Sequence, residues 1–137
     1  MKKILAVTAL LFVFASAAFA IDKFPLGATK NILVDATAAP TIGTEYYISG
    51  EPRGVLTWTL RITGSPTAYV VVIEGSIEGN TGSWHNMSEI NNTTAVTEAD
   101  GVNKMKHIAL KDARFFRARL VSLTGTGTFN VHASIVR

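Results

Sequence analysis

The chain has 137 residues, with 13 basic and 10 acidic side chains and a formal net charge of +3. It has no cysteine, which excludes disulfide bonds, a thiol nucleophile and cysteine-based metal sites. Two of the basic residues are Lys2 and Lys3, so the rest of the chain is nearly neutral. We therefore expect no nucleic-acid partner, because binding to a phosphate backbone needs concentrated positive charge.

Residues 1–20 have the three-part order of a secretory signal peptide. A basic start is followed by an uncharged apolar run over 4–15 and by Ala18-Phe19-Ala20, an A-x-A cleavage pattern. The apolar run is too short to span a bilayer comfortably, so we favour cleavage after Ala20 over a retained transmembrane helix. We expect no transmembrane segment after cleavage. The pattern predicts bacterial export to the periplasm or the cell exterior.

The first part of the exported chain, residues 21–137, predicts short extended segments. Residues 21–45 begin irregularly, because proline restricts both itself and the residue before it, and they are a candidate for an extended N-terminal arm. Strands are predicted over 31–36 and 46–48, with a break at 40–43 between them.

The clearest periodic signal lies at 55–63, where apolar and polar residues alternate as in a half-buried antiparallel strand. Trp58 is in register with the apolar set, so we expect it in the core. Gly64-Ser65-Pro66 is expected to end this strand, and a β-branched run at 69–73 favours the next one. A turn is expected at 78–82, with a return strand beginning near Trp84.

The second part predicts a polar loop over 88–104 and short strands at 106–110, 115–123 and 129–135. Gly125-Thr126-Gly127 is interpreted as a tight connection between the last two. Seven or eight short strands, with no sustained helical stripe, predict an all-β antiparallel sandwich of jelly-roll or Greek-key type. We see no sign of a second domain, and expect residues 21–137 to form a single one.

Two segments also carry a family resemblance. VVIEGSIEG at 71–79, followed by Trp84, and ARFFRARL at 113–120 form a strand-turn signature and a later strand. They resemble galactose-binding-like jelly rolls, including discoidin-type carbohydrate- or surface-binding modules, and small β-sandwich proteins of phage virions and bacterial exports. The resemblance covers 69–137 and implies a β-sandwich with a packing tryptophan. The cysteine pair common in discoidin modules is absent here.

No residue pattern points to catalysis. His85, His107 and His132 have no close metal-ligand spacing, and there is no G-x-S-x-G elbow. Carboxylates such as Glu74 and Glu78 are sequence neighbours beside a turn, whereas acid–base catalysis needs a pair across a cleft. We expect no enzyme activity, no cofactor and no metal site.

Candidate ligand-binding residues are aromatic, amide or basic. An aromatic side chain in a strand is either a core anchor or a platform for a sugar ring, and of adjacent aromatics one faces in and one faces out. Arginines two residues apart share a strand face, either as a cationic patch or as solvated partners of neighbouring strands. The candidates are Trp84, Asn86, Tyr46, Tyr47, Arg117 and Arg119.

The leading hypothesis is an exported, non-catalytic β-sandwich with a structural or interaction role at the cell envelope or outside the cell. The alternative is a carbohydrate-binding module, and a small secreted hydrolase is the third and least favoured hypothesis. The partner is then a glycan or another protein. Self-association is expected to use exposed edge strands or the N-terminal arm, because an unpaired strand edge can accept a further strand.

Overall fold

The computed structural model describes residues 21–49, 54–92, 102–109 and 113–136. The predicted leader lies outside these residues. The described part of the chain is all-β, with eight strands and no helix, which confirms the predicted fold class. Accordingly, it contains no helix that could cross a bilayer. The strands are β1 (Asp22–Lys23), β2 (Thr29–Ala36), β3 (Thr41–Ile42), β4 (Tyr46–Tyr47), β5 (Val55–Ser76), β6 (His85–Asn92), β7 (Val102–Ala109) and β8 (Phe115–Val136).

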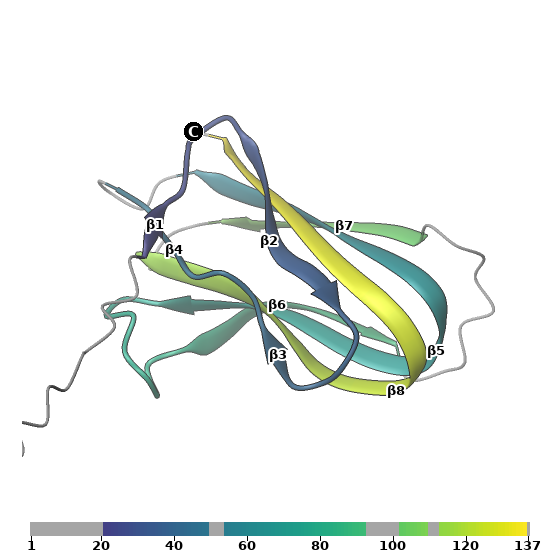
Figure 1. Cartoon of the computed structure of the whole chain (residues 1–137). Coiled ribbons are helices and arrows are strands. Elements are labelled where there is room, and N and C mark those ends of the chain that lie inside the picture. The colour runs from purple at the N-terminus through teal and green to yellow at the C-terminus, as the bar shows by residue number, and fades with distance from the viewer. Residues whose placement is uncertain (1–20, 50–53, 93–101, 110–112, 137) are drawn as a thin grey trace, which may run out of the picture.

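Two strands of 22 residues, β5 and β8, organise the fold. They pair antiparallel along their whole length, and both bend at the middle, so that each runs from one layer of the sandwich into the other (Figure 1). At the bend Gly64 lies opposite Gly127, and Pro66 lies opposite Gly125. The prediction that these glycines end separate strands was wrong. The glycines of the two strands lie opposite one another in the ladder, and both strands bend at this point.

The remaining strands flank the two halves of this pair. In the first layer, β2 pairs with the second half of β8, and β7 pairs with the first half of β5. In the second layer, β3 and β4 pair with the first half of β8, and β6 pairs with the second half of β5. All of these pairings are antiparallel, whereas β1 pairs with β4 in parallel. The sheet is therefore mixed but mostly antiparallel.

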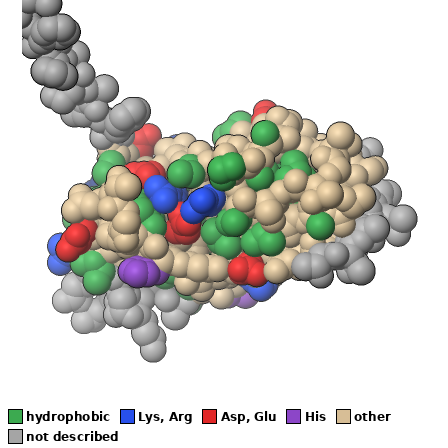
Figure 2. All heavy atoms as spheres, turned by 90° about the horizontal axis from the view of Figure 1, so that it is seen from below, with side chains coloured by type: hydrophobic (Ala, Val, Ile, Leu, Met, Phe, Trp, Pro, Cys, Tyr) green, Lys and Arg blue, Asp and Glu red, His purple; other side chains and the backbone are tan. Residues whose placement is uncertain are grey.

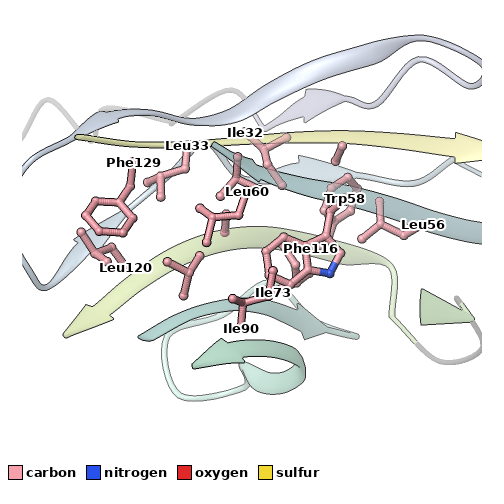
Figure 3. Packing of buried hydrophobic residues seen from close by; sticks show 14 of the residues in the cluster. Ile32, Leu33, Leu56, Trp58, Leu60, Ile73, Ile90, Phe116, Leu120 and Phe129 are labelled. Carbon is pink, nitrogen blue, oxygen red and sulfur yellow. The ribbon is translucent and has the colours of Figure 1, made fainter. Parts of the chain in front are cut away.

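The core lies between the layers and is built from the inward positions of the long strands (Figure 3). The predicted alternation at 55–63 is confirmed, since Leu56, Trp58 and Leu60 are fully buried. The Trp58 indole N–H donates to the Ser88 hydroxyl at 3.2 Å, which links β5 of the first layer to β6 of the second. This bond satisfies the polar atom that burial of a tryptophan brings into a core.

The segment that precedes β5 closes one side of the sandwich. The Gly43 N–H donates to the Ala118 carbonyl and the Thr44 N–H donates to the Ile32 carbonyl, both at 2.9 Å. A Cβ on Gly43 would lie 1.9 Å from the Ile32 carbonyl oxygen, so only glycine allows this approach. Phe24 is buried and contacts the rings of Tyr46 and Phe116 edge-on. Residues 21–45 thus contribute to both the sheet and the core.

Candidate functional site

Charged, aromatic and aliphatic side chains gather on the outer surface of the second layer. The ladder register places Ile42 and Val72 on either side of Arg119, and Glu74 directly opposite Arg117. Figure 2 shows basic and acidic side chains together on this surface, with hydrophobic side chains around them. We call this surface the ionic face. It comprises Ile42, Glu45, Tyr47, Val72, Glu74, Trp84, Arg117, Arg119 and Val121.

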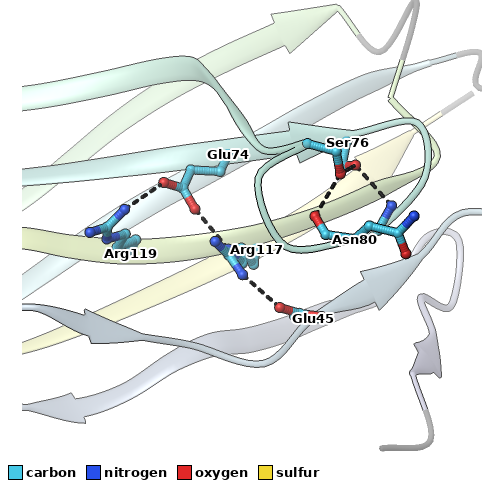
Figure 4. A network of polar contacts seen from close by, with 8 residues as sticks. Glu45, Glu74, Ser76, Asn80, Arg117 and Arg119 are labelled. Atoms are coloured by element: carbon cyan, nitrogen blue, oxygen red, sulfur yellow. Dashed lines mark hydrogen bonds and ion pairs between the residues drawn. The ribbon is translucent and has the colours of Figure 1, made fainter.

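Four of these side chains form a chain of alternating charge (Figure 4). Arg117 donates from Nε to Glu74 and from Nη1 to Glu45, both at 2.7 Å. Arg119 donates from Nη1 to the other oxygen of Glu74 at 3.2 Å. The order is therefore Glu45, Arg117, Glu74, Arg119, and its net charge is zero.

Of the two middle members of this chain, Glu74 is buried and Arg117 nearly so, whereas the two end members are half-buried. The side chains of Glu74 and Arg117 are 10% and 12% exposed, whereas those of Glu45 and Arg119 are 34% and 35% exposed. Both oxygens of Glu74 accept hydrogen bonds from arginine. A buried charge of this kind is stable only while its partners remain, and loss of one partner typically costs about 3–5 kcal/mol.

Trp84 covers the Arg117 guanidinium. The guanidinium carbon lies 4.1 Å from the centre of the indole ring, which is a close cation–π contact. Trp84 is half-buried, and one face of its ring is occupied by the arginine. On the same face, Tyr47 of β4 and Phe115 of β8 pack with their ring centres 5.2 Å apart. The arginine is thus fixed by two carboxylates and an aromatic ring before any ligand arrives.

The loop that carries Trp84 is held by Ser76. The Ser76 hydroxyl accepts hydrogen bonds from the backbone N–H groups of Glu78 and Gly79 and shares a third with the Ser83 hydroxyl at 2.6 Å. Ser76 is only 2% exposed. A serine whose hydroxyl bonds to amides two and three residues ahead is a recognised turn device, so the sequence contained this signal. The sequence analysis chose neither Ser76 nor Glu45 as a site residue.

The predicted candidates separate into two groups. Trp84, Tyr47, Arg117 and Arg119 lie on the ionic face, and Asn86 is exposed on β6 directly opposite Glu74. Tyr46 instead is buried in the core, where desolvation and, to a lesser extent, the charge of Asp22 raise its pKa above the usual 10.0. Both arginines are paired with acids, Arg117 with Glu45 and Glu74 and Arg119 with Glu74.

Elsewhere, the described residues offer less specific features. They contain no group of three or more His, Asp or Glu side chains that could hold a metal ion. An open depression of about 390 Å³ lies at the bend of β5 and β8. It is lined by Thr37, Thr63, Gly64, Gly125, Thr126, Gly127 and Thr128. These groups are hydroxyls and backbone, without a charged side chain to orient a ligand.

Comparison with known proteins identifies similar folds but no family to which the chain belongs. No family model and no curated protein sequence matches the chain. The prophage-derived protein YomS of SPBc2 is 17% identical, with 77% of this chain and 90% of that one aligned and a TM-score of 0.47. The K3 cleaved adhesin domain of Lys-gingipain from Porphyromonas gingivalis w83 is 16% identical, with 80% and 71% aligned and a TM-score of 0.51. The chain is therefore a β-sandwich whose fold is similar to that of an adhesin domain.

Proposed function

We propose that this protein is an exported, non-catalytic interaction module that acts at the cell envelope or outside the cell. The observation that carries the proposal is the ionic face, which combines tryptophan, tyrosine and two arginines on one sheet surface. These residue types are enriched where proteins bind one another and supply most of the energy at such contacts.

The internal bonding of the face supports binding over catalysis. Both oxygens of Glu74 are occupied by arginine, and Arg117 is held by two acids and Trp84. A general acid or base needs a position open to the substrate, and these central groups offer none. A surface whose side chains are already ordered loses less conformational entropy on binding.

Two further observations support the location and the role. The 1–20 pattern is that of a cleaved leader, and cleavage after Ala20 would release a chain that begins at Ile21. For the role, the fold is similar to that of an adhesin domain.

The proposal is tested by photo-crosslinking in living bacteria that express the chain with a C-terminal tag. A photoreactive residue replaces Val121 on the ionic face or, as the matched control, exposed Thr63 on the outer surface of the first layer. We expect an exported product that begins at Ile21 and an adduct from position 121 but not from position 63. A product that keeps residues 1–20 inside the cell, or equal adduct yields from both positions, would overturn the proposal.

A carbohydrate ligand is the second candidate. Tyr47 and Trp84 are both half-buried rather than buried, and exposed Asn86 follows Trp84 by two residues and lies opposite Glu74. Part-exposed aromatic rings beside amide groups suit the apolar faces and hydroxyls of a sugar. Glycan-array binding that is lost in Trp84→Ala and kept in Thr63→Ala would support this candidate, and an array without hits would reject it.

A further inference from the structure

The two ends of the charge chain are half-satisfied and opposite in sign. Glu45 uses one oxygen for Arg117, and among the described residues no hydrogen bond reaches its other oxygen. Arg119 uses Nη1 for Glu74, and among the described residues no hydrogen bond reaches its Nη2. The two side chains are almost equally exposed, at 34% and 35%. The ionic face therefore presents one carboxylate and one guanidinium that can each form a further hydrogen bond.

Such a face is complementary to itself. When a second copy is turned by a half rotation and laid on the first, the acidic end of each meets the basic end of the other. Interfaces of this isologous kind, with the same surface patch on both subunits, are the commonest in protein assemblies. Arginine and carboxylate groups form strong charge-assisted hydrogen bonds in such a contact.

We propose that the ionic face binds a second copy of this chain about a two-fold axis, with Arg119 of each copy paired to Glu45 of the other. The inference rests on the proposed function, because it names the partner of the same face. Ile42 lies directly opposite Arg119 and is 51% exposed, and Val121 is 38% exposed. Burial of these aliphatic side chains would exclude water and strengthen the flanking ion pairs.

The edge strand β7 is less suited to self-association than this face. On β7, Lys104 and Lys106 lie opposite the core residues Leu60 and Trp58, so they stand on the inward side of an edge strand. Lys106 donates to the Glu89 backbone carbonyl on β6, and the Lys104 ammonium lies 5.8 Å from the Tyr69 ring. Inward lysines on an edge strand oppose the addition of another strand.

The N-terminal arm is also engaged within its own chain. β1 pairs with β4, and the Phe24 N–H donates to the Tyr47 carbonyl at 3.0 Å. The Phe24 side chain is 2% exposed. Donation of this arm to a neighbour would expose a core aromatic, so the sheet face is the better candidate for association between copies.

The test is the mass of the purified protein, in the form in which cells accumulate it, by sedimentation equilibrium. We expect a concentration-dependent dimer. Ile42→Asp should weaken it roughly 30-fold or more, since the change buries an unpaired charge at the contact. The matched control is Val34→Asp, which alters an exposed aliphatic residue on β2 of the first layer and should leave the dimer intact.

A mixing experiment tests the pairing itself. Arg119→Glu and Glu45→Arg should each abolish the homodimer, whereas an equimolar mixture should form a heterodimer, because both cross-pairs are then of opposite charge. Circular dichroism of each variant verifies that it is folded. Lys30→Glu, which makes the same charge change as Arg119→Glu at an exposed position on β2, should still dimerise.

Three outcomes overturn the inference. One is a monomeric wild-type protein, and another is a dimer that survives Ile42→Asp. The third is folded charge variants whose mixture does not associate. If the protein is monomeric and position 121 crosslinks to a different protein, the proposed function stands and self-association is rejected. If there is neither a dimer nor an adduct, both proposals fail.

Discussion

The two outer faces of the sandwich are built on the same two strands, β5 and β8, yet their outward side chains differ in how far they are exposed to solvent. On the first layer, the outward residues of β5 are half-buried or exposed, as at Thr59 and Thr63. On the second layer, the outward residues Val72, Glu74 and Ser76 are buried at 4%, 8% and 2% exposure. The backbone arrangement is shared, so the difference comes from what covers each face.

The first outer face consists mostly of hydroxyl, amide and imidazole groups. Thr63 lies opposite Thr128, and Thr57 lies opposite Ser134 with its hydroxyl 2.9 Å from the His107 imidazole. On the second face, two arginines and the loop that carries Trp84 cover the outward positions. A side chain can be removed from the first face without leaving a buried, unpaired charge. On the second face, removal of an arginine leaves Glu74 buried without one of its partners.

The largest expected effect is that of Arg117→Ala. It leaves Glu74 buried with only Arg119 as a partner and removes the group that Trp84 covers. We expect the free energy of unfolding to fall by about 3–5 kcal/mol in urea denaturation. Arg119→Ala, at the exposed end of the same chain, is the control and should cost clearly less. Equal losses for the two variants would contradict the distinction between buried and exposed members.

Ser76→Ala should have the next largest effect. The change leaves the Glu78 and Gly79 N–H groups without their acceptor, at a cost of about 1–2 kcal/mol. Hydrogen exchange of those two amides should accelerate, and the fluorescence of the loop tryptophan should change as its ring leaves Arg117. Ser122→Ala, at an exposed position on β8, should leave both measurements unchanged.

The sequence was a good guide to inward and outward positions within each strand. Alternation at 55–63 placed Trp58 in the core correctly, because a period of two is a property of the strand itself. The same rule placed Arg117 and Arg119 together on the outer side of β8. It also gave Tyr46 and Tyr47 opposite orientations, and the structure shows which of the two is buried.

Features that depend on distant partners could not be found in this way. Gly64-Ser65-Pro66 has the local composition of a turn, and only its register with Gly125 and Gly127, about 60 residues away, makes it a bend in a continuous strand. Glu45 stands in a short irregular stretch without periodicity. Its role comes from the pairing of β4 with β8, which brings it 2.7 Å from Arg117. Local patterns do not encode either pairing.

High pH should destabilise the second layer through Tyr46, which lies beneath the ionic face. Because its pKa is raised in the folded state, the unfolded chain loses the phenolic proton first as the pH increases. The stability that Tyr46 contributes is therefore complete below pH 10 and is lost as the pH rises through the folded-state pKa. In Tyr46→Phe the unfolding free energy measured between pH 9 and pH 11 should fall less steeply. An unchanged slope would exclude Tyr46 as the cause.

The smallest expected effect is that of placing an ion pair like that of Glu74 and Arg117 on the outer face of the first layer. Thr63 and Thr128 lie opposite each other on β5 and β8, as Glu74 and Arg117 do in the other half of the same pair. Thr63→Glu with Thr128→Arg therefore supplies the same two charges at the same relation in the ladder, but at positions that solvent reaches. A double-mutant cycle should give a coupling of about 0.2–1 kcal/mol, as for exposed pairs, and 1 M salt should reduce it. The corresponding cycle on Glu74 and Arg117 should give a larger coupling that salt changes little. If the transplanted pair matched the native one, strand register alone would account for the strength of the ionic face, and the covering by Trp84 and Arg119 would be incidental.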